Sequence, residues 1–372
     1  DDDAVAIGYE SGSTTSVQDL KLALDRAKAD AFSAWLVSLD AANAITARIS
    51  SFGGAYSLYG ADGGAWSAPS TIVSVSAPDG GMVGGPKVAV DSTGAATIVW
   101  EEYEGTRGRI YAKRWYSGVY QQMGRVQLDS DWNEGATGAS IGVDIAGNVI
   151  AVWSEWGGNT PGIWSNRFDA DAGAWTGPVR VETASSGYGG LAVLSVDGEG
   201  NAAAAWYVGS GIQYNRYSRT TERWGDAGVV TTGDAWGEFA PNIYAGTGGE
   251  VTIVFTEQSA SNGEVTEVKR LDTKYDALGR LVAFHETTVA KFDGGAQSPT
   301  IVQIAGNRAG HAVIIWNQGG DFWEMTHDPN TQSWLDAGVI TSRSSTSYGA
   351  PAIAVGESGD AIIAWEEADA GQ

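Results

Sequence analysis

Short apolar segments recur along the chain, and each leads into a polar four-residue turn, a second apolar segment and a large aromatic residue, here called the anchor. In three nearly superposable copies the anchor follows the turn Asp by nine residues: Asp91 to Trp100, Asp144 to Trp153 and Asp197 to Trp206. Weaker copies bring the anchors to seven: Trp35, Trp100, Trp153, Trp206, Phe255, Trp316 and Trp365. Such a period indicates an array of one repeated unit.

Each repeat predicts four strands. Two strands flank the turn, a third follows the anchor, and a fourth begins at another aromatic residue. In the third strand a cation follows an apolar residue by four positions, at Arg48, Arg114, Arg167, Arg216 and Lys269. The fourth strand begins at Trp66, Tyr120, Trp175, Trp224 or Trp334. Repeats of strand and turn at this length are typical of propeller blades.

We therefore predict an all-β chain forming one domain over residues 1–372, a seven-bladed β-propeller with four antiparallel strands per blade. Six or eight blades are the alternatives. Residues 4–9 read as a strand without a preceding partner, which we expect to complete the last blade and so cover a sheet edge. Residues 17–31 have helix-favouring composition, but Leu20, Leu22 and Leu24 alternate, so we expect a strand.

The net charge of the chain indicates which classes of partner it is expected to bind. Acids outnumber bases 45 to 22, a formal net charge of -23, which disfavours nucleic acid and anionic membranes. There are no cysteines, so disulfides and thiolate chemistry are excluded. No apolar run is long enough to span a membrane. The chain begins Asp-Asp-Asp, and we expect a mature secreted protein, extracellular or periplasmic, whose signal peptide has been removed.

The Asp-x-x-Gly turn resembles the sialidase Asp-box, Ser/Thr-x-Asp-x-Gly-x-x-Trp, but has two residues between Asp and Gly and a more distant Trp. It also resembles the tryptophan-docking motif of quinoprotein propellers. Asp suits the start of a type I turn and Gly a positive φ, so a structural role is expected. The third-strand cations are expected to bond a neighbouring strand or to pair with acids. In architecture the repeats are similar to propeller lectins and bacterial surface propellers, which implies multivalent glycan recognition.

Carboxylates recur two residues beyond the anchor, at Glu102, Glu155, Glu257 and Glu367, with Gln318 and Val208 in two copies. They should lie at the opposite end of each blade from the turns, where propellers usually bind ligands. They could hold sugar hydroxyls or a cation there, or be no more than solvated strand ends. Calcium needs six to eight converging oxygens, which a wide ring does not provide. We expect no cofactor, with calcium as the alternative.

Aromatic residues beside acids or small polar residues recur in the loops between repeats. A ring of this kind can stack on a sugar while neighbouring polar groups bind its hydroxyls, or it can fill the space between blades. The predicted contacts are Trp132, Trp156, Tyr188, Trp236 and Tyr348, aided by Glu102, Glu155, Asp234 and Glu257.

Catalytic motifs are absent. The three histidines are far apart, and no nucleophile elbow or phosphate-binding loop occurs. We therefore predict non-catalytic glycan binding outside the cell. A propeller-type glycoside hydrolase or polysaccharide lyase, using a carboxylate pair, is one alternative. A scaffold for protein–protein contacts at a cell surface or in a matrix is the other, since fold alone does not choose among them.

Overall fold

The computed structural model describes the backbone of the following residues: 5–8, 19–28, 31–39, 44–53, 70–74, 83–91, 93, 95–105, 107–115, 125–129, 135–156, 161–182, 189–208, 211–231, 241–246, 249–258, 265–275, 281–293, 302–307, 309–318, 321–331, 333–341, 347–348, 351–356, 359–365 and 367–368. Up to residue 83 the description covers strands and their pairing only. The chain forms two compact units: an N-terminal unit, Tyr9–Arg180, and a C-terminal unit, Asp1–Gly8 with Val181–Gln372.

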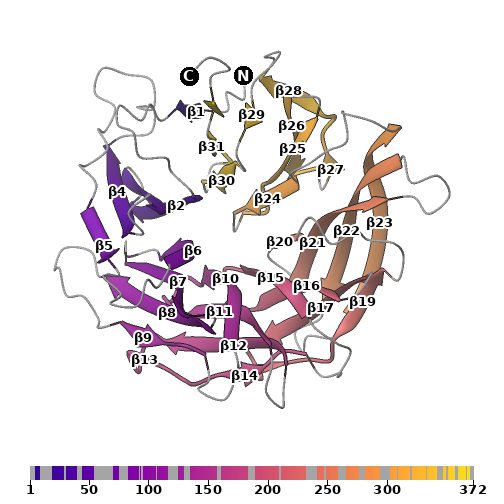
Figure 1. Cartoon of the computed structure of the whole chain (residues 1–372). Helices are drawn as coiled ribbons and strands as arrows, with labels where there is room; N and C mark the ends of the chain where they lie inside the picture. Colours follow the sequence, from indigo (N-terminus) through magenta and orange to yellow (C-terminus); the bar gives the residue numbers. More distant parts are fainter. Residues whose placement is uncertain are drawn as a thin grey trace. The chain divides into compact units, whose positions relative to one another are not determined.

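The N-terminal unit contains three sheets (Figure 1). The first consists of β2 (Asp19–Lys28), β3 (Ala31–Leu39), β4 (Ala44–Gly53) and β5 (Ser70–Ser74). The second consists of β6 (Val83–Val90), β7 (Ala96–Glu104), β8 (Arg107–Trp115) and β9 (Val126–Gln127). The third consists of β10 (Gly135–Val143), β11 (Val149–Trp156), β12 (Gly162–Asp169), β13 (Ala174–Trp175) and β14 (Val179–Arg180).

The C-terminal unit repeats the arrangement. Its first sheet consists of β15 (Gly189–Val196), β16 (Ala202–Val208), β17 (Gly211–Ser218), β18 (Arg223–Trp224) and β19 (Gly228–Thr231). The next consists of β20 (Asn242–Ala245), β21 (Glu250–Gln258), β22 (Val265–Tyr275) and β23 (Leu281–Asp293). The third consists of β24 (Val302–Gly306), β25 (Ala312–Gln318), β26 (Asp321–Asp328), β27 (Ser333–Trp334) and β28 (Gly338–Thr341).

The last described strands make two smaller sheets. β30 (Ala352–Val355) and β31 (Ala361–Trp365) pair antiparallel, and β1 (Val5–Gly8) pairs with β31. A short pair is formed by β29 (Ser347–Tyr348) and β32 (Glu367–Ala368). The N-terminal strand therefore joins the last repeat as expected. It runs parallel to β31, so the prediction of antiparallel strands is wrong for this pair.

Strand order within the six larger sheets of the described chain follows the sequence, and all their pairings are antiparallel. The fourth strand of three sheets is split into two short segments, both paired with the third strand. Within each unit, the first strand of one sheet contacts the first strand of the next. The all-β prediction is confirmed by this series of four-stranded antiparallel sheets, and within residues 17–31 the structure has the predicted strand over Asp19–Lys28.

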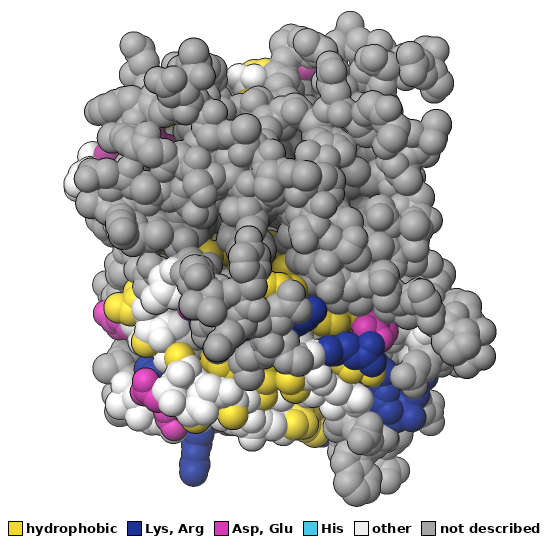
Figure 2. All heavy atoms as spheres, turned by 90° about the vertical axis from the view of Figure 1, so that its left-hand side faces the viewer, with side chains coloured by type: hydrophobic (Ala, Val, Ile, Leu, Met, Phe, Trp, Pro, Cys, Tyr) yellow, Lys and Arg dark blue, Asp and Glu magenta, His cyan; other side chains and the backbone are white. Residues whose placement is uncertain are grey.

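The anchors whose side chains are described lie in the cores of their sheets. Trp100, Trp153, Trp206, Phe255 and Trp316 are at most 2% exposed. In the N-terminal unit, Trp153 packs in a cluster with residues of both the second and the third sheet, among them Val99 and Ile110. The core is therefore formed between successive sheets, because each sheet alone is too thin to bury a tryptophan. Figure 2 shows that acidic and basic side chains are interspersed with apolar ones where side chains are described on one face.

Two cations of the predicted third-strand series do not share the position of the others. Arg114, Arg167 and Arg216 each lie three residues beyond the position opposite the anchor. Lys269 instead lies directly opposite the anchor Phe255, and Arg48 pairs with Leu36, one residue beyond its anchor. The register of a hairpin depends on its turn length, which sequence spacing from the anchor does not reveal.

Candidate functional site

Each sheet has two chemically different ends. The end with the Asp-x-x-Gly turns is here called the turn end. The other, where the second strand continues beyond the anchor, is called the anchor end. The ligand residues predicted from the sequence are expected at the anchor end.

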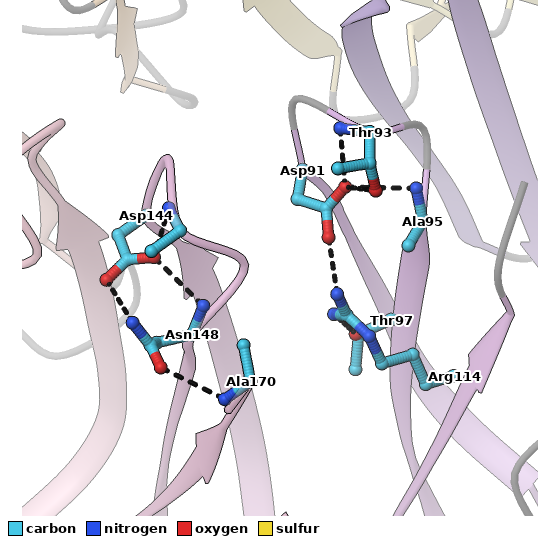
Figure 3. Close-up of polar contacts among 9 residues, drawn as sticks. Asp91, Thr93, Ala95, Thr97, Arg114, Asp144, Asn148 and Ala170 are labelled. Carbon is cyan, nitrogen blue, oxygen red and sulfur yellow. Dashed lines mark hydrogen bonds and ion pairs between the residues drawn. The ribbon is translucent and has the colours of Figure 1, made fainter. Parts of the chain in front are cut away.

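At the turn end, Asp91 organises its own turn and the third strand (Figure 3). Its Oδ1 accepts hydrogen bonds from the Thr93 backbone N–H at 2.8 Å and the Ala95 N–H at 3.1 Å. Its Oδ2 pairs with the guanidinium of Arg114, which also donates to Thr97 Oγ1 at 2.8 Å. Both partners of the ion pair are buried. A buried carboxylate needs this compensation, so the pair is structural.

In the next repeat, the side-chain amide of Asn148 connects the turn Asp to the third-strand Arg. Asp144 accepts from the backbone N–H and the side-chain Nδ2 of Asn148, at 2.9 and 2.8 Å. The Asn148 Oδ1 in turn accepts from the Ala170 N–H at 3.0 Å (Figure 3). It also accepts from Arg167 at 3.2 Å. Asn148 thus stands between the acid and the cation that pair directly in the previous repeat.

A weaker repeat replaces both charges together. Asn307 occupies the Asp position and accepts from the His311 N–H at 3.0 Å, as the Asp residues do in their turns. The third-strand position that holds Arg114, Arg167 and Arg216 in three repeats is Thr326 here, opposite Val313. The acid and the cation are thus both absent from this repeat, whereas they pair directly as Asp91–Arg114 and Asp197–Arg216. The expected structural role of the turns and cations is supported in the described repeats.

At the anchor end, Glu102 and Glu155 are 6% and 3% exposed. The indole Nε1 of Trp100 donates to Glu102 at 2.8 Å, and that of Trp153 donates to Glu155 at 2.9 Å. Arg125 also pairs with Glu102 at 2.7 Å. The alternative that Glu102 and Glu155 are solvated strand ends is wrong, because both carboxylates are buried and accept hydrogen bonds from buried indoles.

Trp156 is the predicted aromatic contact whose side chain the structure describes. It ends β11 opposite Gly135, the first residue of β10. A Cβ atom at Gly135 would lie 2.5 Å from Trp156 Cε2 and Cζ2, so the absent side chain is what allows the indole to lie across the strand. The indole remains partly exposed. One flank is thus fixed by backbone, as a stacking platform requires.

A polar cluster lies around Thr137, two residues beyond Gly135 in β10, and includes Glu101 and Tyr103 of β7. Glu101 accepts hydrogen bonds from Tyr103 Oη at 2.7 Å, Thr137 Oγ1 at 2.8 Å and the Gly138 N–H at 2.7 Å. Gly138 has φ +69°, and a β-bulge follows Thr137, which turns its N–H toward the carboxylate. Glu101 comes from the second sheet and Thr137 from the third, so the cluster joins two successive sheets.

The titration of Tyr103 agrees with this arrangement. Burial is the largest cause that raises the pKa of Tyr103 above its ordinary value, and the hydrogen bond to Glu101 and its negative charge raise it further. The hydrogen bond with Thr137 acts in the opposite direction. The phenol is therefore protonated at neutral pH and donates its proton to Glu101.

Residues 135 and 137 face the same side of β10, because alternate residues of a strand share a face. Glu101, Tyr103 and Thr137 form one hydrogen-bonded group, here called the Glu101 site, and Trp156 lies opposite Gly135, two residues before Thr137 along β10. The sequence prediction included Trp156 and missed the other three. Glu101 and Tyr103 flank Glu102, the residue singled out by the repeat. A Glu-x-Tyr pair on alternate positions was the available signal, but no other repeat contains it.

The remaining predicted contacts are not tested by this geometry. Trp132, Tyr188, Trp236 and Asp234 lie outside the described residues. Tyr348 and Glu257 lie in β29 and β21, opposite Glu367 and Glu267, and their side chains are not described. Among the described residues, no three His, Cys, Asp or Glu side chains are grouped as a metal site would require. In the same part of the chain no helix is long and apolar enough to cross a membrane.

Neither a protein-family model nor a curated protein matches the chain. Similar solved structures include a PL25 ulvan lyase bound to -[GlcA(1-4)Rha3S]-, at 10% identity, TM-score 0.53, and coverage of 89% of this chain and 84% of the lyase. The Dos1 propeller matches at 10% identity and TM-score 0.44, covering 88% and 72%. A Dyadobacter fermentans protein of unknown function matches at 10% identity and TM-score 0.48, covering 87% and 98%. At this level of identity, the match shows that the chain shares its fold with the ulvan lyase.

Proposed function

We propose that this protein is a secreted, non-catalytic carbohydrate-binding protein whose sheets close into a seven-bladed propeller. Closure is supported by the sequential sheets of each unit and by the pairing of β1 with β31. No cofactor is needed for this function, and calcium is not part of the proposal. The other predicted loop aromatics would provide further weak sites, so that repetition raises the apparent affinity.

The observation that carries the proposal is the indole of Trp156. It lies across Gly135, is partly exposed, and shares its strand face with Thr137, whose hydroxyl oxygen lies 3.4 Å from the phenol oxygen of Tyr103. A sugar ring presents C–H groups on its face and hydroxyls at its edge. An aromatic ring beside fixed polar oxygens matches that combination.

A glycan array identifies the ligand, and Trp156→Ala tests the site. We expect the substitution to weaken binding at least about tenfold, which corresponds to about 1.4 kcal/mol. Trp115→Ala is the matched control, since Trp115 is another half-buried tryptophan of the same unit but lies at the turn end, opposite Ala96. No binding to any glycan by folded protein, or an equal effect of both substitutions, would sink the proposal.

A propeller-type glycoside hydrolase or polysaccharide lyase is the alternative, because Tyr103 and Glu101 bring a phenol and a carboxylate together. Incubating the protein with the oligosaccharides it binds separates the two functions. Release of shorter products would contradict non-catalytic binding. Unchanged oligosaccharides are expected.

A further inference from the structure

The geometry points to the ligand class of the Glu101 site. We infer that it binds hydrogen-bond donors, and that among glycans it prefers those with protonated amino groups, such as glucosamine oligomers, to uncharged or acidic ones. This inference rests on the proposed carbohydrate-binding function and specifies its ligand.

The first step concerns the protons of the two hydroxyl groups. Tyr103 and Thr137 both donate to the same Glu101 oxygen, Oε2, at 2.7 and 2.8 Å. Each hydroxyl has one proton to donate. Their oxygens lie 3.4 Å apart and keep only lone pairs for a ligand. Because both hydroxyl protons are bound to the Glu101 carboxylate, Tyr103 and Thr137 can act toward a ligand only as hydrogen-bond acceptors.

The second step concerns charge. Glu101 is 7% exposed, and its hydrogen-bond donors Tyr103, Thr137 and the Gly138 N–H are all neutral groups. The neighbouring Glu102 differs, since it pairs with Arg125. None of these donors brings a positive charge to the site, and a chain of net charge -23 adds to the local negative potential.

The third step concerns the aromatic ring. Trp156 lies opposite Gly135, whose Cα atom is about 7 Å from that of Thr137 at the usual rise per residue. A protonated amine bound by the two acceptor oxygens beside Glu101 gains charge-assisted hydrogen bonds.

The cations of the adjoining strand β8 do not reverse this preference. Arg109 is buried and pairs with Asp129 at 2.8 Å. Arg107, at the start of β8, is half-buried. If Arg107 dominated the site, acidic glycans would bind best, and the experiment below includes that outcome.

Calorimetric titration with three hexamers tests the inference: glucosamine, N-acetylglucosamine and galacturonic acid, at a pH that protonates the amines. Acetylation removes the ligand charge and keeps the sugar ring. We expect glucosamine hexamer to bind about five- to tenfold more tightly than the acetylated hexamer, and the acidic hexamer to bind most weakly. Higher salt should reduce the preference.

Glu101→Gln should bring the affinity ratio of the first two hexamers close to one. Asp171→Asn is the matched control: it removes the same charge from an exposed residue of this unit. Tyr103→Phe and Thr137→Val each remove one acceptor oxygen and keep the carboxylate, so they test the site if Glu101→Gln does not fold. Each should lower the ratio by about two- to threefold.

Two results would overturn the inference alone. One is galacturonic acid hexamer binding as tightly as glucosamine hexamer. The other is a Trp156-dependent binding of the acetylated hexamer with no preference for the amine, which leaves the proposed function intact. Equal effects of Glu101→Gln and Asp171→Asn would show that the preference is not local. Failure of all three hexamers and of every arrayed glycan would instead remove the proposed function.

Discussion

Gly147 closes the turn that begins at Asp144, and its backbone N–H donates to the Asp144 carbonyl at 3.1 Å. Its φ is +82°, a conformation that costs an L-residue about 1–2 kcal/mol. Gly147 also packs on the previous repeat: an added Cβ would lie 3.0 Å from Asp91 Oδ2 and 3.3 Å from Arg114 Nη2. Gly147→Ala therefore perturbs both the turn and the buried ion pair.

The two contributions can be separated within this unit. Gly173 has φ +64°, and a Cβ there would meet nothing within 4 Å. Gly173→Ala should therefore cost only the backbone term, about 1–2 kcal/mol. Gly147→Ala should add about 1–3 kcal/mol for overpacking, because Asp91 and Arg114 are held by other bonds and have little freedom to move. We expect about 2–5 kcal/mol in total.

Urea unfolding, followed by tryptophan fluorescence and circular dichroism, measures both variants. The difference between them is the informative quantity, since the backbone term cancels. If Gly147→Ala costs no more than Gly173→Ala, the packing of one repeat's turn on the ion pair of the previous repeat has no energetic weight. The argument that neighbouring repeats are coupled at the turn end would then be wrong.

Two further predictions concern other described groups. Glu155→Ala leaves the buried Trp153 indole N–H without its acceptor and should lower the unfolding free energy by about 1–3 kcal/mol. Val208 occupies the same position in the repeat of Trp206, whose indole N–H has no acceptor, so Val208→Ala should cost clearly less in the same urea assay. Equal losses in the two variants would contradict this role of Glu155. For Asp169, the Ala172 N–H is the largest cause that lowers its pKa. Its stabilisation is therefore present above the unfolded-state pKa and disappears as pH falls through the folded-state pKa, so the stability loss of Asp169→Asn should shrink in acid, and a pH-independent loss would refute the assignment.

The repeat could be read from the sequence because its signals are local. An Asp and a Gly at fixed separation specify a turn, and an aromatic residue nine positions after the Asp occupies the same place in each sheet. The turns at Asp144 and Asp197 and the buried anchors Trp100, Trp153 and Trp206 confirm this reading. Each of these features depends on a few neighbouring residues, so no distant part of the chain had to be known.

Features that depend on the pairing of strands were harder to predict from the sequence. Lys269 fits the sequence spacing of the third-strand cations but lies opposite the anchor Phe255. Glu102 fits a series of exposed rim carboxylates, yet it is buried because the Trp100 indole needs an acceptor. In both cases the deciding fact is which residue lies across the strand or beneath the side chain, and the spacing along one strand does not contain it.

The sequence by itself determined the all-β class, the order of the sheets and the turn and anchor of each repeat, because strand alternation and turn chemistry act over a few residues. It also predicted Trp156 as a ligand contact. Only the tertiary structure decided that Gly135 leaves room for that indole and that Glu101 binds both Tyr103 and Thr137. Glu101 and Thr137 are 36 residues apart and lie on different sheets. Their meeting depends on how successive sheets pack, which local pattern does not specify.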